Sequence, residues 1–173
     1  TLESILEGAN LKAAWEQVAG NDGAPGVDGM KAKDLQAHLG EQWAGYKQAL
    51  LEGNYRPQAV RRVEIPKPNG GVRQLGIPTV MDRFIQQAIA RKLDEEYDPT
   101  FSESSYGFRR GRSTHQALSK ALEHLNSGLA YIVEIDLERF FDRVNHDRLM
   151  HRLSKRIGDK RVLKLVRNYL KAG

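Results

Sequence analysis

The sequence RRVEIPKPNGGVRQLGIP, residues 61–78, decides the fold because it encodes a β-hairpin. Residues of alternating character lie on both sides of Asn69-Gly70-Gly71, and a glycine-rich turn between alternating segments is a strong hairpin signal. Proline lacks the N–H that a central strand needs, so Pro66 and Pro68 favour an edge position. The stretch therefore predicts a small antiparallel unit.

Before the hairpin, the sequence predicts helices. Apolar residues recur at helical spacing over Leu11–Val18, and the pattern then runs into residues 21–29, which are dense in turn residues. Glycine-rich loops of this kind can cradle phosphate, but no Gly-Lys-Ser/Thr follows, so a plain connecting loop is the favoured interpretation. A second helix is predicted from Ala32 to Glu52.

After the hairpin, cap residues mark the helix starts. Thr79 and Ser113 each stand three residues before a side chain that can complete a capping box. Two more helices are predicted over 146–157 and 160–171, and Asn145 can cap the first of them. Together with the hairpin, these helices indicate an α+β fold.

Residues 129–137 predict a strand that ends in an acidic residue. The strand period of two places Val133, Ile135 and Leu137 on one face and Asp136 on the other. A carboxylate at a strand end is a reasonable ligand for Mg²⁺, a hard cation that prefers carboxylate, phosphate and water oxygens. Asp136 is therefore the leading candidate for a metal ligand.

Phosphoryl transfer by two metal ions needs at least a second carboxylate beside the first. Asp142 is a tempting partner, but an aspartate after a turn more often satisfies backbone donors ahead of a helix. Glu134 shares the predicted face of Asp136, yet it can equally be solvated or paired with an arginine. By its residues alone, the sequence predicts half of a catalytic centre.

The hairpin turn carries the second chemical signal. Lys67 and Arg73 flank the turn and can clamp a triphosphate, the lysine as a point charge and the arginine as a planar fork. Ordinary surface charge on an edge hairpin explains the same residues, and the sequence pattern alone favours that explanation. The five histidines show no metal-ligand spacing, so zinc is not expected.

Composition restricts the classes of partner. The chain of 173 residues has no cysteine, which excludes disulfides and thiolate metal sites, and no apolar stretch approaches the roughly 18 residues of a membrane span. We expect a soluble cytoplasmic protein without a membrane partner. A formal net charge of +5 favours polyanions, and the basic residues form three clusters. These clusters are Arg61, Arg62, Lys67 and Arg73; Arg109, Arg110 and Arg112; and Lys155, Arg156, Lys160, Arg161, Lys164, Arg167 and Lys171.

Three strings of the sequence closely resemble the group II intron reverse transcriptase and maturase family. They are the hairpin with Leu-Gly-Ile-Pro-Thr at 75–79, Ser-Tyr-Gly-Phe-Arg-Arg-Gly-Arg-Ser at 105–113, and Asp-Leu-Glu-Arg-Phe-Phe-Asp-Arg-Val-Asn-His-Asp at 136–147. Residues 21–29 look like the family's N-terminal extension loop. The resemblance implies a right-hand polymerase, with fingers over 1–112, including a palm-type helix near 80–97, and a partial palm over 113–173.

The resemblance also implies roles for particular residues. Asp136 would be a catalytic carboxylate that binds Mg²⁺, with the backbone of Leu137 beside it. Phe141 would stack under the sugar of the incoming nucleotide and exclude a ribose 2′-hydroxyl. Lys67 and Arg73 would contact the deoxynucleoside triphosphate. The family's nucleic-acid contacts would carry over to Gly26 in the loop at 21–29, to Arg61 and Arg62, and to Arg109 and Arg112 near the template path.

The sequence departs from the family pattern in one major respect. It contains no Asp-Asp pair, so the aromatic-x-Asp-Asp box that would complete the catalytic carboxylates is missing. We therefore expect an N-terminal part of an RNA-directed DNA polymerase that is inactive alone, with intron RNA template, DNA primer and dNTP as partners of the complete enzyme. We also expect exposed palm surface to promote self-association, for example as a homodimer.

Two other functions remain open from the sequence. One is a non-catalytic module of a maturase that binds structured intron RNA through shape and phosphate contacts during splicing. The other is a CRISPR-associated or diversity-generating reverse transcriptase, whose distinguishing domains would lie outside this sequence.

Overall fold

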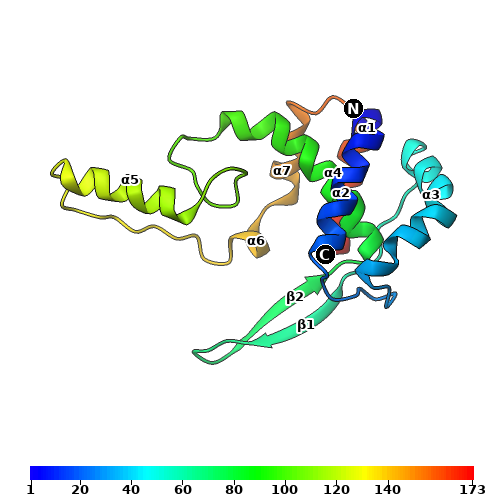
Figure 1. The fold of residues 1–173 in the computed structure, drawn as a ribbon, viewed down its shortest axis with the longest axis horizontal. Helices are drawn as coiled ribbons and strands as arrows, with labels where there is room; N and C mark the ends of the chain where they lie inside the picture. Colours follow the sequence, from blue (N-terminus) through cyan, green and yellow to red (C-terminus); the bar gives the residue numbers. More distant parts are fainter. The chain divides into compact units, whose positions relative to one another are not determined.

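The structure is a computed structural model that describes residues 1–173, and it contains two compact units. The first unit comprises residues 1–92 and 145–173, and the second comprises residues 93–144. Figure 1 labels helices α1–α7 and both strands. In chain order they are α1 (Leu2–Ile5), α2 (Gly8–Gly20), a 3₁₀ turn (Ala32–Asp34), α3 (Leu35–Leu51), β1 (Arg61–Pro66), β2 (Val72–Ile77), α4 (Val80–Tyr97), a 3₁₀ turn (Asp98–Thr100), α5 (Thr114–Asn126), α6 (Phe140–Arg143), α7 (His146–Ser154) and α8 (Lys160–Ala172).

The predicted hairpin is confirmed. Strands β1 and β2 pair antiparallel as a two-stranded sheet, with Ile65 opposite Arg73 and Pro66 opposite Val72. The turn closes through bonds in which Lys67 N–H donates to the Gly71 carbonyl (3.0 Å) and Gly70 N–H to the Lys67 carbonyl (3.1 Å). Gly70 and Gly71 have φ of 86° and 82°, a region that residues with a Cβ avoid. The glycines therefore fix the turn that sets the register.

The cap residues also act as the sequence predicts. The Thr79 hydroxyl accepts a hydrogen bond from Asp82 N–H, and the Asn145 side chain accepts one from Arg148 N–H. Ser113 and Gln116 form a reciprocal capping box at the start of α5. The main deviation is α7, which ends at Ser154 and is three residues shorter than predicted. No helix of the structure is both long enough and apolar enough to cross a bilayer.

The predicted strand at 129–137 is not formed. Residues 129–137 make no strand, and Ile132, Val133 and Ile135 are each more than 80% exposed. The alternation of residue types describes which face this segment can bury, but a strand also needs a neighbour to pair its backbone groups. The only sheet of the structure is the β1–β2 hairpin, so no such neighbour is present.

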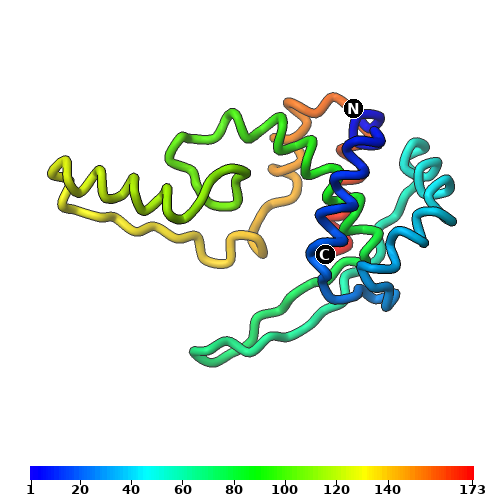
Figure 2. The backbone as a smooth tube through the Cα atoms, viewed as in Figure 1, coloured from blue at the N-terminus to red at the C-terminus, as the bar shows by residue number.

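The first unit joins segments that are far apart in the sequence, and Figure 2 traces the path between them. Leu2 N–H donates to the Asp159 carboxylate across 157 positions, and Val60 N–H donates to the Ala172 carbonyl (3.2 Å). The buried core of this unit draws on the N-terminal helices, α3, α4 and α8. Its apolar members are Leu2, Ile5, Leu6, Ala14, Val18, Ala32, Leu35, Leu50, Val80, Met81, Phe84, Ile85, Ala88, Ile89, Val162 and Leu165.

Asp82 is a buried carboxylate at the centre of this unit, with 1% of its surface exposed. Its oxygens accept hydrogen bonds from the Tyr55 hydroxyl (2.8 Å), the Gln58 N–H (3.1 Å) and the Thr79 hydroxyl (2.7 Å). Burial and the neighbouring Asp82 charge raise the pKa of Tyr55, so its hydroxyl keeps the proton that it donates. A buried carboxylate is tolerated when it is hydrogen-bonded, and these three donors all bond to the oxygens of Asp82.

Replacing Asp82 by alanine should strongly destabilise the protein. The variant leaves the hydroxyls of Tyr55 and Thr79 and the N–H of Gln58 without their acceptor, which we expect to cost about 3 kcal/mol or more in the free energy of unfolding. Thermal unfolding followed by circular dichroism should show a Tm lowered by roughly 6–12 °C. The matched control is Asp94→Ala on the exposed side of the same helix. Equal Tm values for the two variants would contradict the role of Asp82.

A second prediction concerns acid stability. Asp159 caps α8 and accepts from Arg161 N–H, the Arg161 guanidinium and Leu2 N–H, and the Arg161 hydrogen bonds hold the pKa of Asp159 well below its usual range. Because the folded pKa is depressed, the stabilisation is complete above the unfolded value of about 4 and is lost as the pH falls below it.

Asp159→Ala should therefore lower the free energy of unfolding by about 1–2 kcal/mol at pH 7, the usual range for loss of a helix cap. The difference in the free energy of unfolding between this variant and the unchanged chain should become smaller below about pH 4. Denaturant titration at several pH values measures this difference. Asp159→Asn is the matched variant, because it keeps cap acceptors and removes the charge. A gap that stays constant down to pH 2 would contradict the assignment.

Candidate nucleic-acid and triphosphate site

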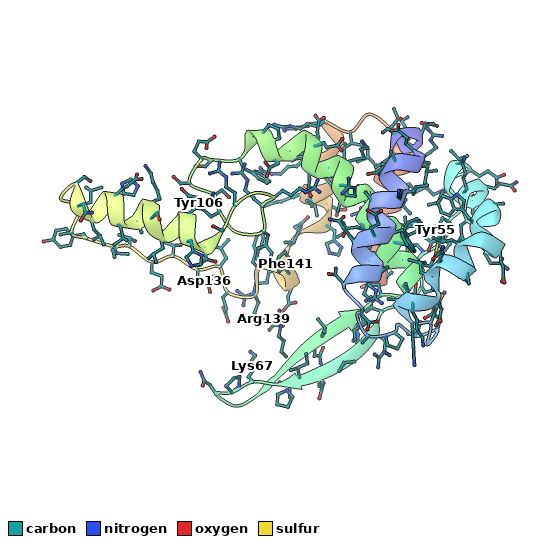
Figure 3. The ribbon with its side chains drawn as sticks, in the orientation of Figure 1. Tyr55, Lys67, Tyr106, Asp136, Arg139 and Phe141 are labelled. Atoms are coloured by element: carbon teal, nitrogen blue, oxygen red, sulfur yellow. The ribbon has the colours of Figure 1, made fainter.

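The tip of the hairpin presents two free cations. Lys67 lies in the turn, at the end of the hairpin in Figure 3, and Arg73 lies in β2; both are exposed and neither side chain has a hydrogen-bond or ion-pair partner. Arg73 stands opposite Ile65, and continued alternation from Ile65 places Lys67 on the same face. Both residues therefore flank the turn on one face of the hairpin, and their joint contact with a triphosphate stays a prediction.

Residues at the base of the hairpin hold the glycine-rich loop. Arg61 Nε donates to the Pro25 carbonyl (2.8 Å), so this arginine fastens the loop at 21–29 to β1. Gly26 is buried, and a Cβ placed on it would lie 2.6 Å from the Thr79 Cα. The residue is glycine because two backbones approach closely here, which the sequence reasoning did not foresee. Arg62 points to the opposite face of β1 and is exposed.

The acidic segment belongs to the second unit. Asp136 is exposed, and its Oδ1 accepts a hydrogen bond from Leu137 N–H (2.9 Å). Phe141 is 89% exposed and its ring lies 5.6 Å from that of Phe140. Figure 3 shows Asp136, Arg139 and Phe141 along this one stretch of chain. Lys67 and Arg73 belong to the first unit, and Asp136 belongs to the second. A contact between the hairpin and Asp136 therefore stays a prediction.

The carboxylates near Asp136 are engaged by arginines. Asp142 pairs with Arg139 (3.1 Å), and Glu138 pairs with Arg143 (3.3 Å). The capping role expected for Asp142 is not observed, since Asn145 caps the next helix. No group of three or more His, Asp or Glu side chains in the structure could hold a metal ion.

Arg109 is held inside its own loop. Its Nε and Nη2 donate to the Asp98 carboxylate (2.7 and 3.0 Å), and its remaining N–H groups donate to the carbonyls of Ser102, Ser105 and Asp98. These contacts use all five guanidinium donors, and the side chain is 8% exposed. The Arg109 hydrogen bonds lower the pKa of Asp98. In this structure Arg109 shapes the loop and has no donor left for a phosphate.

Arg112 is only partly engaged. It pairs with Glu103 (2.8 Å) and lies 5.5 Å from the ring centroid of Tyr106, while a quarter of its side chain stays exposed. Glu103 is itself 93% exposed, so this ion pair is weak and can exchange for a phosphate. The nucleic-acid contact expected for Arg112 stays a prediction. No pattern in the sequence distinguishes the partly exposed Arg112 from the buried Arg109. The carboxylate that holds Arg109 is Asp98, eleven positions away, and a local pattern does not reach that far.

Residues 65–172 match the model of the reverse transcriptase (RNA-dependent DNA polymerase) family. The chain is 39% identical to protein YkfC of Escherichia coli K12 over 153 residues, which is 86% of this chain and 40% of that protein. It is 40% identical to the group II intron-encoded protein LtrA of Lactococcus lactis over 127 residues, 73% of this chain and 21% of that protein.

A more distant relative is the nuclear intron maturase 1 of Arabidopsis thaliana, with 29% identity over 94 residues, or 54% of this chain and 13% of that protein. The chain thus spans less than half the length of each of these relatives.

Proposed function

This chain belongs to the group II intron-encoded branch of the reverse transcriptase family, and we propose that it forms the fingers and the first part of the palm of an RNA-directed DNA polymerase. The observation that carries this proposal is the pair of unpartnered cations, Lys67 and Arg73, on one face of an exposed hairpin. The fingers would comprise residues 1–112, and the partial palm residues 113–173.

The reaction would join the primer 3′-oxygen, whose hydroxyl proton passes to water, to the α-phosphorus of a deoxynucleoside triphosphate. The bond from that phosphorus to the β-phosphate oxygen breaks, and pyrophosphate leaves with the electron pair. Lys67 and Arg73 would bind the triphosphate oxygens, because a flexible ammonium and a planar guanidinium fork both donate to phosphate. Neither side chain must first leave a protein partner, so the clamp is ready for its ligand.

Asp136 would supply one carboxylate to the catalytic centre, with the backbone of Leu137 beside it. Reverse transcriptases as a family generally use Mg²⁺. Phosphoryl transfer by two ions needs at least a second carboxylate beside Asp136. Glu138 and Asp142 are engaged in exposed ion pairs with Arg143 and Arg139, which a metal ion would have to displace. Phe141, with its exposed ring, would lie under the sugar of the nucleotide.

A second candidate function is a binding module of a maturase. The incomplete carboxylate set and the exposed lysines of α8 favour it: Lys160, Lys164 and Lys171 stand at helical spacing and are all exposed. Such a stripe attracts phosphates irrespective of sequence. Intron RNA template and DNA primer would be partners in the first function, and structured intron RNA alone in the second.

Triphosphate binding tests the proposed clamp. Arg73→Ala should weaken binding of a deoxynucleoside triphosphate about tenfold or more, since charge-assisted hydrogen bonds are lost, and Arg73→Lys should recover only part of the affinity because lysine lacks the fork. Lys67→Ala should act in the same direction. Calorimetric titration measures the effect, with Lys33→Ala as the control for an exposed lysine in another element. Unchanged affinity in both hairpin variants would refute the clamp.

Primer extension tests whether this chain is active alone, and RNA preference separates the two candidate functions. With RNA template, annealed DNA primer, dNTPs and Mg²⁺, we expect the 173-residue chain alone to give no extended product, because its carboxylate set is incomplete. Clear extension would contradict this expectation. Preference for intron RNA over random duplex across a salt series would favour the binding module, whereas pure counterion release would show no such preference.

A further inference from the structure

The loop from Phe101 to Arg112 displays an aromatic ring in an unusual way. Phe108 is fully exposed, at 113% of its reference surface, and its φ is +57°. The left-handed region is disfavoured for residues with a Cβ and is an outlier for a bulky one. A backbone strain of this kind persists only where the surrounding structure imposes it, and such residues gather at functional sites.

Arg109 anchors the loop beside Phe108. It follows Phe108 directly, and its five N–H groups tie this point of the loop to Asp98 and to the carbonyls of Ser102 and Ser105. Its guanidinium also lies 5.5 Å from the ring centroid of Phe101. With residue 109 fixed inward, the preceding side chain is turned outward to solvent.

The surroundings of Phe108 are suited to a polyanion. Arg110 is exposed, and no hydrogen bond or ion pair engages it. A Cβ placed on Gly107 or Gly111 would meet nothing within 4 Å, so the backbone on both sides is open to a ligand. Between residues 101 and 112 there are three arginines against one acidic residue, Glu103.

We propose that Phe108 and Arg110 form a stacking site for single-stranded nucleic acid, in which the ring stacks on a base and the guanidinium binds the adjoining phosphate. Sequence-tolerant binders of single strands combine these two groups, because every base has a stacking face and every nucleotide a phosphate. Arg109 is the positioning residue of this site. The inference rests on the proposed function, because the stacking site would bind the unpaired part of the template.

An apolar contact with another protein segment is the competing explanation of an exposed phenylalanine. The variant Phe108→Leu distinguishes base stacking from an apolar protein contact, because leucine retains apolar surface but has no π-face for a base. Glycine separates binding from folding, because it adopts positive φ without strain. Phe108→Gly should therefore keep or raise Tm while it removes binding.

The test is fluorescence anisotropy of the 173-residue chain with a labelled single-stranded oligonucleotide of about 12 nucleotides, as RNA and as DNA. Phe108→Leu should raise Kd about tenfold, and Phe108→Trp should keep it within about twofold. An oligonucleotide with abasic sites should bind Phe108→Leu and the unchanged chain equally. Arg110→Gln should reduce the slope of log K against log salt by about 0.7. Tyr131→Ala is the matched control, an aromatic residue 97% exposed in the same unit.

Arg109→Lys tests the positioning role. It should weaken binding when Phe108 is present and have little further effect in the Phe108→Leu background, because both changes remove the same stacked ring. Full affinity of Phe108→Leu, or equal losses in Phe108→Leu and Tyr131→Ala, would overturn the inference. If the Phe108 inference fails but triphosphate binding depends on Arg73, the proposed function stands without the stacking site. If the unchanged chain binds neither single strands nor triphosphate, both fall.

Discussion

The buried carboxylate of Asp82 is the interaction on which the arrangement of the first unit depends. It receives the Thr79 hydroxyl at the start of α4 and also Tyr55 and Gln58, which lie on the chain entering the hairpin. Strand β1 begins at Arg61, only three residues after Gln58. Strand β2 ends at Ile77, two residues before Thr79, which caps α4. One buried charge therefore sets both ends of the hairpin that carries Lys67 and Arg73.

Arginines of the same sequence cluster have different roles in the structure. Arg61 and Arg109 donate to backbone carbonyls, whereas Arg73 and Arg110 have no protein partner. Arg61 reaches from β1 to the loop at 21–29, and Arg109 stays within its own loop. The distinction is physical: a guanidinium whose donors are saturated by buried acceptors contributes rigidity, and one that faces water contributes its charge to a ligand.

Local rules predicted the parts of this fold that have local causes. The hairpin follows from Asn69-Gly70-Gly71, and the helix starts follow from Thr79 and Ser113, because turn and cap residues act over a few positions. The hub at Asp82 and the Asp98–Arg109 pair join residues up to 27 positions apart, and no pattern in one sequence marks them. The resemblance identified the family, but the loop geometry at Arg109 required coordinates.

The unpaired segment at 129–137 shows why an active-site carboxylate is more than a residue in a motif. Asp136 lies among Ile135 and Leu137, both exposed, and its backbone forms no ladder that would fix the direction of its side chain. Helix α5, which precedes the segment, also leaves Leu118, Leu122 and Leu125 exposed at helical spacing. Apolar faces of this extent are stable when another layer covers them. Strand pairing would bury Ile135 and orient Asp136 in a single step, because neighbouring side chains on a strand point to opposite faces. The same pairing event would therefore orient Asp136, the carboxylate that we propose for the catalytic centre, which the unpaired segment does not do by itself.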